Sequence, residues 1–439
     1  MLQLSHNYLT LTDITNVQTK KLIDSLIYKG FNMIQENFKI NEKLWEIGVI
    51  DDRDVPFHRL TLTKGTTYNS YFYNTEKPTV IDTVDMIYGK NYIENLSKKV
   101  NLDDIYYIVV NHTEPDHSGA LGLLVRKAKN AKIVCSQKAV EHLKEVYKIT
   151  DREFIVVKTG DTLDLGGKTL NFYNVPNLHT EETMMSYCPE DKILFSCDIF
   201  STHIATQNAT NSLELNNIDE DYSVYYDLIF SPHRIYIIDL LKIVDSLDIQ
   251  LIAPSHGYIL DKDIKHYIDI YREKSKTTSE VKKATIVYTS MRGNTRKIAK
   301  YITDKLSATN RFEVSLFDAD KAPHNEILDS IKSSELILVG SATKYGDMIG
   351  SLDSLLKELP SLEGKTTAAF GSFAWSGEAI EIIGDYLIGA SSHYLTTSET
   401  IKKTGCMEYE FPIRLRYNLS DENMRKVDSA ITYLESILN

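Results

Sequence analysis

The sequence IYYIVVNHTEPDHSG, residues 105–119, decides the fold of the first half of this chain. Its apolar run 105–110 has the length and composition of a buried strand. Directly after this run, residues 112–117 place two imidazoles and two carboxylates within six positions. Such a cluster at the end of a buried strand is costly in free energy unless a divalent cation holds it. The stretch therefore predicts a metal-binding loop, whose remaining ligands must come from other segments.

The length and composition are those of a soluble protein with two domains. The 439 residues are too many for one ordinary hydrophobic core. Hydrophobic residues make up 42% and charged residues 25%, both close to the globular average, and no window is as long and apolar as a membrane span. The net charge of -12 argues against nucleic acid as a partner, because phosphate binding needs a basic surface.

The N-terminus and the cysteines predict a cytoplasmic location. The N-terminus lacks the succession of basic, apolar and small residues that marks a secretory signal. The four cysteines show no paired spacing, which fits a reducing compartment. The sequence contains no C-x-x-C pair, so it holds no rubredoxin-type iron site and no zinc ribbon.

Strand and helix patterns alternate on both sides of the metal-binding loop. Before the loop, we expect a short amphipathic helix at 20–34, a β-meander with strands at 44–50, 66–73 and 79–83, and a helix at 93–100. After it, helical patterns at 120–129 and 139–147 alternate with strand patterns at 132–135 and 154–158. This alternation predicts an α/β domain in which helices cover a sheet.

Three further strand patterns end in residues that can bind metal. The strand at 170–175 leads to His179, the strand at 192–197 runs directly into Asp198, and the strand at 249–253 leads to His256. Loops beyond strand ends gather at one site in sheets of this kind. The candidate ligands are therefore His112, Glu114, Asp116, His117, His179, Asp198 and His256.

Seven ligands suit two metal ions that share one carboxylate. Asp198 is the natural bridge because it stands alone, whereas the two carboxylates of the loop each sit beside a histidine. Taken singly, a histidine at one of these strand ends would more often be a surface or core residue, and Asp198 could cap a helix. As a set at four strand ends, they favour metal binding. Imidazole and carboxylate ligands without thiolate suit iron, manganese or zinc, and the share of carboxylates favours a redox-capable iron pair.

A second domain follows a polar linker. The pattern at 261–271 is helical, and 274–283 contains almost no apolar residue. We therefore expect an N-terminal extension at 1–38, a metal-binding domain at 39–280 and a second domain at 281–439.

The second domain begins with an anion-binding pattern. A strand at 284–288 is followed by a loop of small residues at 289–295 and a helix at 296–306. Unpaired backbone N–H groups and hydroxyls converge in such a loop, which is too short for a Walker A and lacks its lysine. Standing alone, this loop would be taken for an ordinary capped strand-to-helix turn.

Two more strands, at 336–340 and 366–370, end in loops of hydroxyl and glycine residues. Each of these loops also carries an aromatic residue, Tyr345 in the first and Trp375 in the second. Both could be core aromatics, but their place beside glycines favours contact with a flat flavin, which needs close backbone approach at its edges and an apolar or aromatic face. The candidate flavin contacts are Ser290, Met291, Arg292, Gly293, Asn294, Thr295, Ser341, Ala342, Thr343, Lys344, Tyr345, Gly346, Ser372, Phe373, Ala374, Trp375, Ser376 and Gly377.

Both sets of motifs resemble those of one family. H-x-E-x-D-H followed by distant His, Asp and His resembles the metallo-β-lactamase-like domain of the flavodiiron proteins, also called A-type flavoproteins. The succession S-M-x-x-N-T, G-S-x-T and F-G-S-x-x-W-S-G-E resembles their flavodoxin-like half. The resemblance covers roughly residues 40–438 and implies an α/β fold. Its N-terminal part would be a metallo-β-lactamase-like αβ/βα sandwich, followed by a flavodoxin-like doubly wound parallel sheet.

The resemblance also implies the cofactors, FMN and two non-haem iron ions. One iron would take His112, Glu114 and His179. The other would take Asp116, His117 and His256, with Asp198 shared. Zinc hydrolases of the same fold usually carry a histidine at the position of Glu114, so this residue distinguishes the two chemistries.

The activity that the resemblance implies is the reduction of O2 to water, of NO to N2O, or of both. Electrons would pass through FMN from an external donor such as rubredoxin or a flavin- or deazaflavin-linked reductant, because no rubredoxin domain is fused. A head-to-tail homodimer, or a dimer of dimers, would bring the flavin of one subunit to the iron of the other. Candidates for donating protons or hydrogen bonds to bound oxygen are His58, His203, Tyr225 and Tyr226, and packing alone accounts equally well for each of them.

Two departures and two alternatives accompany the resemblance. Residues 1–38 are additional, and 180–182 reads Thr-Glu-Glu where relatives often place an aromatic residue. One alternative is a dinuclear zinc hydrolase with an attached flavin electron-transfer domain. The other is a non-catalytic flavin redox module with a structural metal. Iron content and gas consumption with a reduced donor separate all three.

Overall fold

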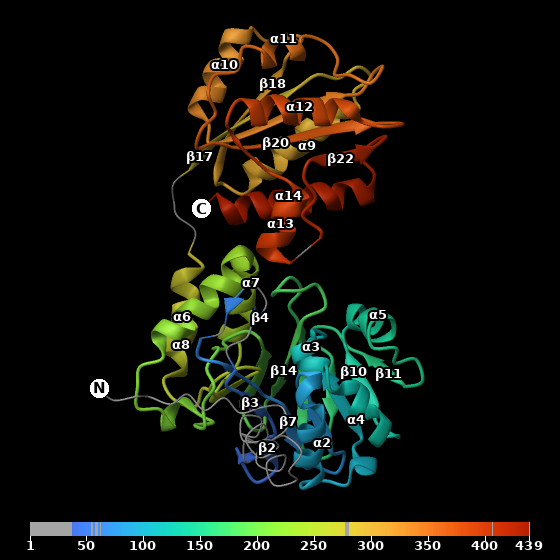
Figure 1. Ribbon diagram of the computed structural model, residues 1–439, viewed down its shortest axis with the longest axis vertical. Coiled ribbons are helices and arrows are strands. Elements are labelled where there is room, and N and C mark those ends of the chain that lie inside the picture. Colours follow the sequence, from blue (N-terminus) through green and yellow to red (C-terminus); the bar gives the residue numbers. More distant parts are fainter. Residues whose placement is uncertain are drawn as a thin grey trace, which may run out of the picture. The chain divides into compact units, whose positions relative to one another are not determined.

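The computed structural model describes residues 37–438 except 54, 55, 58, 59, 62, 277–280 and 406. The expected helix at 20–34 lies outside the described residues, and so do His58 and linker residues 277–280. The chain divides into two compact units, which are described separately (Figure 1). In the described part of the chain, no helix is long and apolar enough to cross a membrane.

The elements up to residue 274 belong mainly to the first compact unit, whereas residues 226–246 and 268–274 belong to the second. In order they are β1 (Phe38–Lys39), β2 (Leu44–Glu46), β3 (Val49–Asp51), β4 (Pro56–Phe57), β5 (Leu60–Thr61), β6 (Thr66–Tyr68), β7 (Tyr71–Tyr73), β8 (Thr79–Ile81), η2 (Met86–Tyr88), α2 (Gly89–Ser97), η3 (Leu102–Asp104), β9 (Tyr107–Val110), α3 (Pro115–Ser118), α4 (Leu121–Lys127), β10 (Lys132–Cys135), α5 (Gln137–Glu145), β11 (Phe154–Val156), β12 (Thr162–Asp164), β13 (Thr169–Asn174), β14 (Met184–Cys188), β15 (Ile193–Cys197), η4 (Asn211–Leu213), α6 (Asp219–Tyr225), η5 (Tyr226–Phe230), η6 (Ser231–His233), α7 (Arg234–Asp245), β16 (Leu251–Pro254) and α8 (Ile264–Lys274).

Two sheets form the centre of the first unit. One has the strand order β1-β2-β7-β8-β9-β10-β11, and the other has the order β12-β13-β14-β15-β16. A core cluster joins the two sheets, with Tyr73 and Val109 from the first and Phe172 and Phe195 from the second. Helices α2, α4 and α5 cover the other face of the first sheet.

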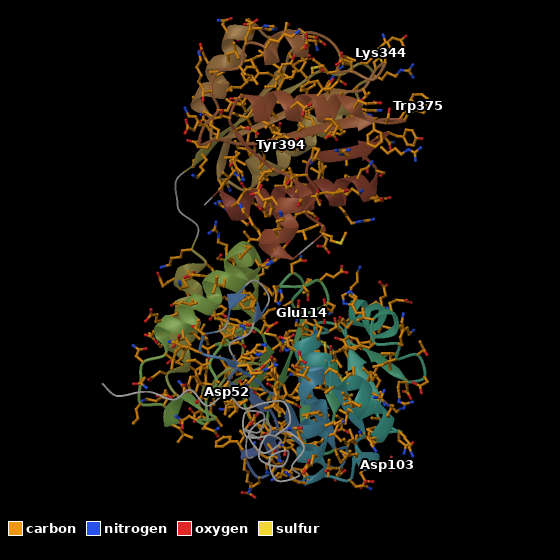
Figure 2. All side chains as sticks on the ribbon, viewed as in Figure 1. Asp52, Asp103, Glu114, Lys344, Trp375 and Tyr394 are labelled. Atoms are coloured by element: carbon orange, nitrogen blue, oxygen red, sulfur yellow. The ribbon has the colours of Figure 1, made fainter. Side chains whose placement is uncertain are left out.

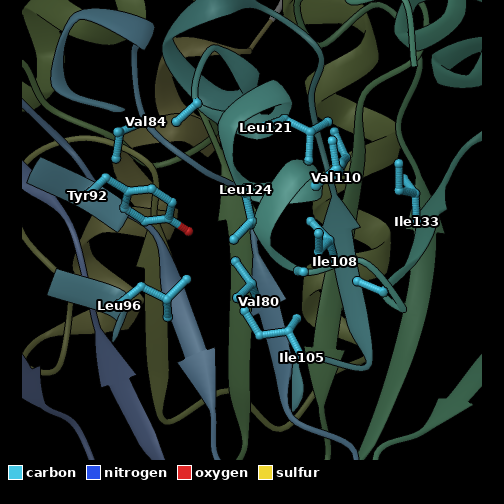
Figure 3. Packing of buried hydrophobic residues seen from close by; sticks show 14 of the residues in the cluster. Val80, Val84, Tyr92, Leu96, Ile105, Ile108, Val110, Leu121, Leu124 and Ile133 are labelled. Carbon is cyan, nitrogen blue, oxygen red and sulfur yellow. The ribbon is translucent and has the colours of Figure 1, made fainter. Parts of the chain in front are cut away.

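Strand β9 shows why this arrangement follows from the sequence. All four of its residues are buried, as expected for a strand that is covered on both faces. Because successive side chains point to opposite faces, Ile108 and Val110 pack beneath the helices while Tyr107 and Val109 enter the core between the sheets. Figure 3 shows Ile108 and Val110 in the helix-covered core, which Leu124 of α4 also joins.

Several sequence predictions for this unit are wrong in detail. The expected strands at 44–50 and 66–73 are each two strands, because β2 and β7 join the large sheet whereas β3 pairs with β6. Gly48 lies between β2 and β3, where a Cβ would overlap the carbonyl oxygen of Tyr68. The motif expected to be a loop contains one helical turn, α3, with a proline at its start. Strands β12 and β14 were not expected from the sequence.

The second half of the chain forms one further sheet with its helices. Its elements are β17 (Lys282–Tyr288), α9 (Asn294–Ala308), β18 (Phe312–Asp318), α10 (His324–Ser333), β19 (Leu336–Ala342), α11 (Leu352–Leu356), β20 (Thr366–Phe373), α12 (Glu378–Gly389), β21 (His393–Tyr394), α13 (Thr397–Thr404), β22 (Ile413–Arg416) and α14 (Asp421–Ile437).

This sheet is parallel and doubly wound. Its order is β18-β17-β19-β20-β21, and β22 also pairs with β20. Helices α9 and α14 supply the core on one face, and α10, α11 and α12 supply it on the other (Figure 1). The chain reverses its direction of winding between β17 and β19, and ligands bind at the carboxyl ends of strands at such a point. The predicted α/β class is confirmed, and the boundary near residue 280 stays a prediction.

Candidate metal centre and flavin site

The structure brings the seven candidate metal ligands together. Their ligand atoms form two groups, and within each group these atoms lie within 4.8 Å of one another. The first group is His112, Glu114, His179 and Asp198, and the second is Asp116, His117 and His256.

Asp198 lies between the two groups. Its Oδ2 is 3.5 Å from Nε2 of His112, and its Oδ1 is 3.2 Å from Nε2 of His117 and 3.4 Å from Nε2 of His256. Each carboxylate oxygen therefore faces a different group. This is the geometry that a carboxylate shared between two metal ions requires.

Four strand ends deliver these side chains. His112 and Glu114 follow β9, and Asp116 and His117 lie on α3. The remaining ligands are His179 from the loop between β13 and β14, Asp198 directly after β15, and His256 directly beyond β16.

Close packing constrains the chain beside His256. Gly257 has a φ of +70°, and a Cβ there would overlap the side chain of Thr202. Glycine is therefore needed at this turn, directly after the ligand His256.

Hydrogen bonds orient three of the ligand imidazoles. Nδ1 of His112 lies 2.7 Å from Oε1 of Glu182, and Nδ1 of His256 lies 2.6 Å from the carbonyl oxygen of Thr67. Nδ1 of His117 lies 3.8 Å from Sγ of Cys197. A ring that donates through Nδ1 keeps the lone pair of Nε2 for a metal ion. In all three rings Nε2 points toward the carboxylates of the cluster.

The electrostatics of the cluster fit cation binding. Burial lowers the pKa of His117, but Asp116 and Asp198 outweigh it, so that the pKa lies well above its ordinary value. Burial raises the pKa of Asp116, but His117 and His256 hold it well below its usual range. Burial raises the pKa of the Cys197 thiol to about 11, and its sulfur lies close to His117 and Asp198 in a third possible ligand group. Four imidazoles and three carboxylates fit a pair of metal ions.

The candidate hydrogen-bond donors near the cluster fall into different places. The Tyr225 hydroxyl donates to Oδ1 of Asp198 at 3.0 Å. The ring of His203 lies 4.8 Å from that of Tyr225 and 5.0 Å from that of His256, with its Nδ1 2.9 Å from Oγ1 of Thr66. Tyr226 instead bonds Oγ of Ser275 at 2.6 Å, away from the ligands. His58 lies outside the described residues.

Sequence reasoning missed the partners of the ligand imidazoles. Glu182 is 2% exposed and bonds His112, although in the sequence it stood out only as part of an unusual Thr-Glu-Glu segment. An acidic residue three positions after a candidate ligand was the available signal. The carbonyl of Thr67 has no sequence signal, because every residue carries one.

The candidate flavin loops meet at the ends of β17, β19 and β20. They enclose a cavity of about 310 Å³, within the range of ligand pockets. The residues that line it are Ser290, Met291, Arg292, Asn294, Thr295, Ala342, Thr343, Ser372, Phe373, Ala374, Trp375 and Tyr417. Gly293, Ser341, Lys344, Tyr345, Gly346, Ser376 and Gly377 belong to the same described loops but are not on the cavity wall.

The first of these loops has the features of an anion cradle. Gly293 is the N-cap of α9 with a φ of +83° and has no side chain to cap the helix, while Oγ of Ser290 accepts from the backbone N–H of Arg296 at 3.3 Å. A Cβ on Gly293 would point into open space, with no atom within 4 Å. The N–H groups at the start of α9 therefore face a cradle suited to phosphate. Hydroxyl pairs brace the loops, with Thr295 Oγ1 3.0 Å from Ser372 Oγ and Thr289 Oγ1 3.0 Å from Ser341 Oγ.

The two predicted aromatic residues are on the surface. Trp375 is 92% exposed and Tyr345 is 95% exposed, so the alternative that they are core aromatics is wrong. Figure 2 shows Trp375 at the margin of the second unit. Tyr417, directly after β22, was not predicted; its backbone N–H donates to the carbonyl of Phe373 at 2.8 Å and its ring joins the cavity wall.

Comparison with family models and protein sequences finds matches for both halves of the chain. A model described as the ODP family beta lactamase matches residues 67–257, and a flavodoxin model matches 286–389. An anaerobic nitric oxide reductase flavorubredoxin of Vibrio vulnificus is 34% identical, with 78% of this chain and 70% of that protein covered. An uncharacterized protein of Methanocaldococcus jannaschii is 35% identical, with 80% of this chain and 89% of that protein covered.

Solved structures give the same result. The flavodiiron protein from Giardia intestinalis matches with a TM-score of 0.54 at 28% identity, covering 92% of this chain and 97% of that one. The rubredoxin oxygen:oxidoreductase from Desulfovibrio gigas matches with a TM-score of 0.53 at 26% identity, covering 91% of this chain and 98% of that one. The predicted order of a metallo-β-lactamase-like and a flavodoxin-like half is confirmed, as are FMN and a diiron centre as cofactors of the family. The chain therefore belongs to the flavodiiron protein family.

Proposed function

We propose that this protein reduces O2 to water, NO to N2O, or both, at a diiron centre that receives electrons through FMN. The observation that carries the proposal is the position of Asp198, whose two carboxylate oxygens face two separate ligand groups. Two adjacent metal sites with a shared ligand suit the reduction of a diatomic molecule. Family membership supports oxidoreductase chemistry, and the names of two relatives refer to NO reduction and to oxygen:oxidoreductase activity.

The proposed ligand assignment follows the two groups. His112, Glu114 and His179 would hold one iron, and Asp116, His117 and His256 would hold the other, with Asp198 shared. Glu114 favours iron over the zinc pair of a hydrolase, because a third carboxylate makes the donor set harder and more negative. Its Oε2 lies 3.4 Å from Nε2 of His112, so it belongs to the first group by distance as well as by sequence.

The protein side chains position the centre and supply protons. When bound, the iron pair supplies the redox-active site and FMN supplies the electrons. Tyr225 fixes one oxygen of Asp198 through a 3.0 Å hydrogen bond, which holds the shared carboxylate in one orientation. Both reductions consume protons, and His203, packed between Tyr225 and His256, is the imidazole best placed to deliver them.

The flavin is proposed to occupy the cavity at the ends of β17, β19 and β20. The phosphate would accept hydrogen bonds from the loop at the start of α9, whose hydroxyl and N–H groups line the cavity. Trp375 and Tyr417 offer aromatic surface to the ring system.

The external donor and the assembly are also proposals. The name of one relative joins a flavin to a rubredoxin, and another is called a rubredoxin oxygen:oxidoreductase. We therefore propose rubredoxin, or a flavin- or deazaflavin-linked reductant, as the donor in the cytoplasm. A head-to-tail homodimer or dimer of dimers is the expected state, and light scattering of the purified holoprotein measures it.

The test is steady-state consumption of O2 and of NO, compared under one reducing system. Purified protein should contain about two irons per chain, as the seven-ligand set requires, together with FMN. Gas consumption should depend on both. Two zinc ions with hydrolase activity would overturn the proposal in favour of the hydrolase. Full iron and FMN without consumption of either gas would favour a redox module instead.

A further inference from the structure

Glu182 receives three hydrogen bonds on one carboxylate oxygen. Its Oε1 lies 2.7 Å from Nδ1 of His112, 3.2 Å from the backbone nitrogen of Thr113 and 2.8 Å from Oγ1 of Thr113. The residue is 2% exposed, just before β14, and its carbonyl oxygen accepts a bond from Oγ of Ser136 at 2.8 Å. Backbone and side chain are therefore both fixed, beneath the first group of metal ligands.

The direction of these hydrogen bonds follows from the donors available. An ionised carboxylate only accepts, so the hydroxyl proton of Thr113 points at Glu182. Oγ1 of Thr113 then accepts from Nδ1 of His142, which lies 2.9 Å away. The proton on Nδ1 of His112 also points at Glu182, so Nε2 of His112 is the nitrogen left for metal. His142 is partly exposed, and the network thus extends from the surface to a buried ligand.

The other two oriented imidazoles meet a backbone carbonyl and a sulfur atom through Nδ1. His256 faces the carbonyl of Thr67, and His117 faces the thiol of Cys197 at the longer distance of 3.8 Å. A carboxylate is a stronger acceptor than a carbonyl or a thiol, and it gives the donating imidazole more anionic character. The two ligand groups therefore differ in the atom that faces Nδ1 of their imidazoles, which is a carboxylate oxygen for His112 and a carbonyl oxygen or a sulfur for the others.

We propose that Glu182 is a positioning residue that makes the two metal positions unequal. It holds His112 as an Nε2 ligand and strengthens its donation, so that the ion in the group of His112 is bound more tightly and is more electron-rich than its neighbour. The loop between β13 and β14 then serves that ion twice, with His179 as a ligand and Glu182 behind a second ligand. The inference rests on the proposed diiron function.

Three substitutions separate charge from geometry. Glu182→Gln keeps an oxygen that accepts from His112 and Thr113 but removes the negative charge. Glu182→Ala removes both, and Glu182→Asp keeps the charge at a shorter reach. Glu181→Gln is the matched control, because it removes the neighbouring carboxylate of the same loop and leaves the bond between Glu182 and His112 in place.

Metal affinity and iron spectroscopy are the measurements. Stripped protein is titrated anaerobically with Fe²⁺ against a chelator, and the protein loaded with ⁵⁷Fe is measured by Mössbauer spectroscopy. Loss of a partner behind a ligand typically costs about 10- to 100-fold in metal affinity. We expect Glu182→Gln to weaken one of the two ions by that factor and to shift one of two iron signals. Glu182→Ala should weaken it at least as much, Glu182→Asp should restore part of the loss, and Glu181→Gln should match the wild type.

Several outcomes would overturn the inference. They are an equal loss of both ions in Glu182→Gln, no loss at all, or the same loss in Glu181→Gln. FMN content and the melting temperature of each variant show whether a loss of metal reflects unfolding. Wild-type protein that takes up two irons and consumes gas, beside a Glu182→Gln variant of normal affinity, would remove the inference alone. Wild-type protein that takes up no pair of irons would remove the proposed function and the inference with it.

Discussion

The metal cluster and the flavin cavity are built in opposite ways. The ligands His112, His117 and His256 are at most 1% exposed. The side chains of His117 and His256 both contact the carboxylate of Asp198. The proposed flavin cavity is lined by residues of three loops, several of which carry hydroxyls, and by the almost fully exposed Trp375. The chemistry proposed for the first site would depend on side-chain identity, whereas the FMN binding proposed for the second would depend on backbone conformation. Substitutions at the two sites should therefore fail in different ways.

The largest effect is expected from Asp198→Asn. The shared carboxylate would become a neutral amide, and both ligand groups would lose a charged donor. Gas reduction should fall by more than the about 100-fold that loss of an outer partner can cost. Flavin content and flavin reduction should stay normal, because the cavity lies at the sheet of β17, β19 and β20, which contains none of the metal ligands. Oxygen and NO electrodes, with an absorbance assay for flavin reduction, measure both. Full activity would remove Asp198 from the centre.

The next effect is expected from Tyr225→Phe, which deletes the hydroxyl that bonds Asp198. The loss of this partner should lower gas reduction by about 10- to 100-fold. The matched control is Tyr226→Phe, which deletes a neighbouring hydroxyl that bonds Ser275 instead. Tyr226→Phe should cost only about 1 kcal/mol of unfolding free energy and leave the kinetics unchanged. Equal kinetic losses in both variants would mean that packing, rather than the bond to Asp198, matters.

Gly293→Val tests the backbone side of the comparison. A β-branched residue at a φ of +83° costs about 1 to 3 kcal/mol of strain. A loop that shifts to relieve this strain would move the N–H groups of α9 away from the proposed phosphate position, so FMN affinity should fall by about tenfold. Gly364→Val is the control. Gly364 has a φ of +75°, and a Cβ added there would meet no atom within 4 Å, but it lies in the turn before β20 and not in a candidate flavin loop. It should lower stability by a similar amount without weakening FMN. Flavin fluorescence measures the dissociation constant. Normal FMN binding in Gly293→Val would show that the cavity is misassigned.

The same contrast explains what the sequence could reveal. The metal ligands could be proposed because His, Asp and Glu are rare at the ends of buried strands, and four such ends carried them. Glu182 could not be assigned, because its contact with His112 spans 70 positions and depends on how the β13–β14 loop folds. The bond from His256 to the carbonyl of Thr67 could not be predicted either, because every residue carries a backbone carbonyl.

The fold itself shows the same limit. Long apolar runs such as β9 were found within a few residues. The division of 44–50 into two strands was missed, because it depends on tertiary crowding at Gly48 rather than on local pattern. Tyr417 joins the flavin cavity from a strand that follows α13, a placement set by the pairing of β22 with β20.

The smallest effect, and the sharpest test of the flavin cavity, is expected from Trp375→Ala. An aromatic contact with the flavin contributes about 0.5 to 1.5 kcal/mol, so FMN affinity should fall by about 2- to 10-fold. Stability should not change, because the side chain is 92% exposed. Tyr345→Ala is the control, since Tyr345 is as exposed and was predicted on equal grounds but is not on the cavity wall. A larger loss in Tyr345→Ala than in Trp375→Ala would mean that the flavin lies against the β19 loop, and the cavity would have to be redrawn around it.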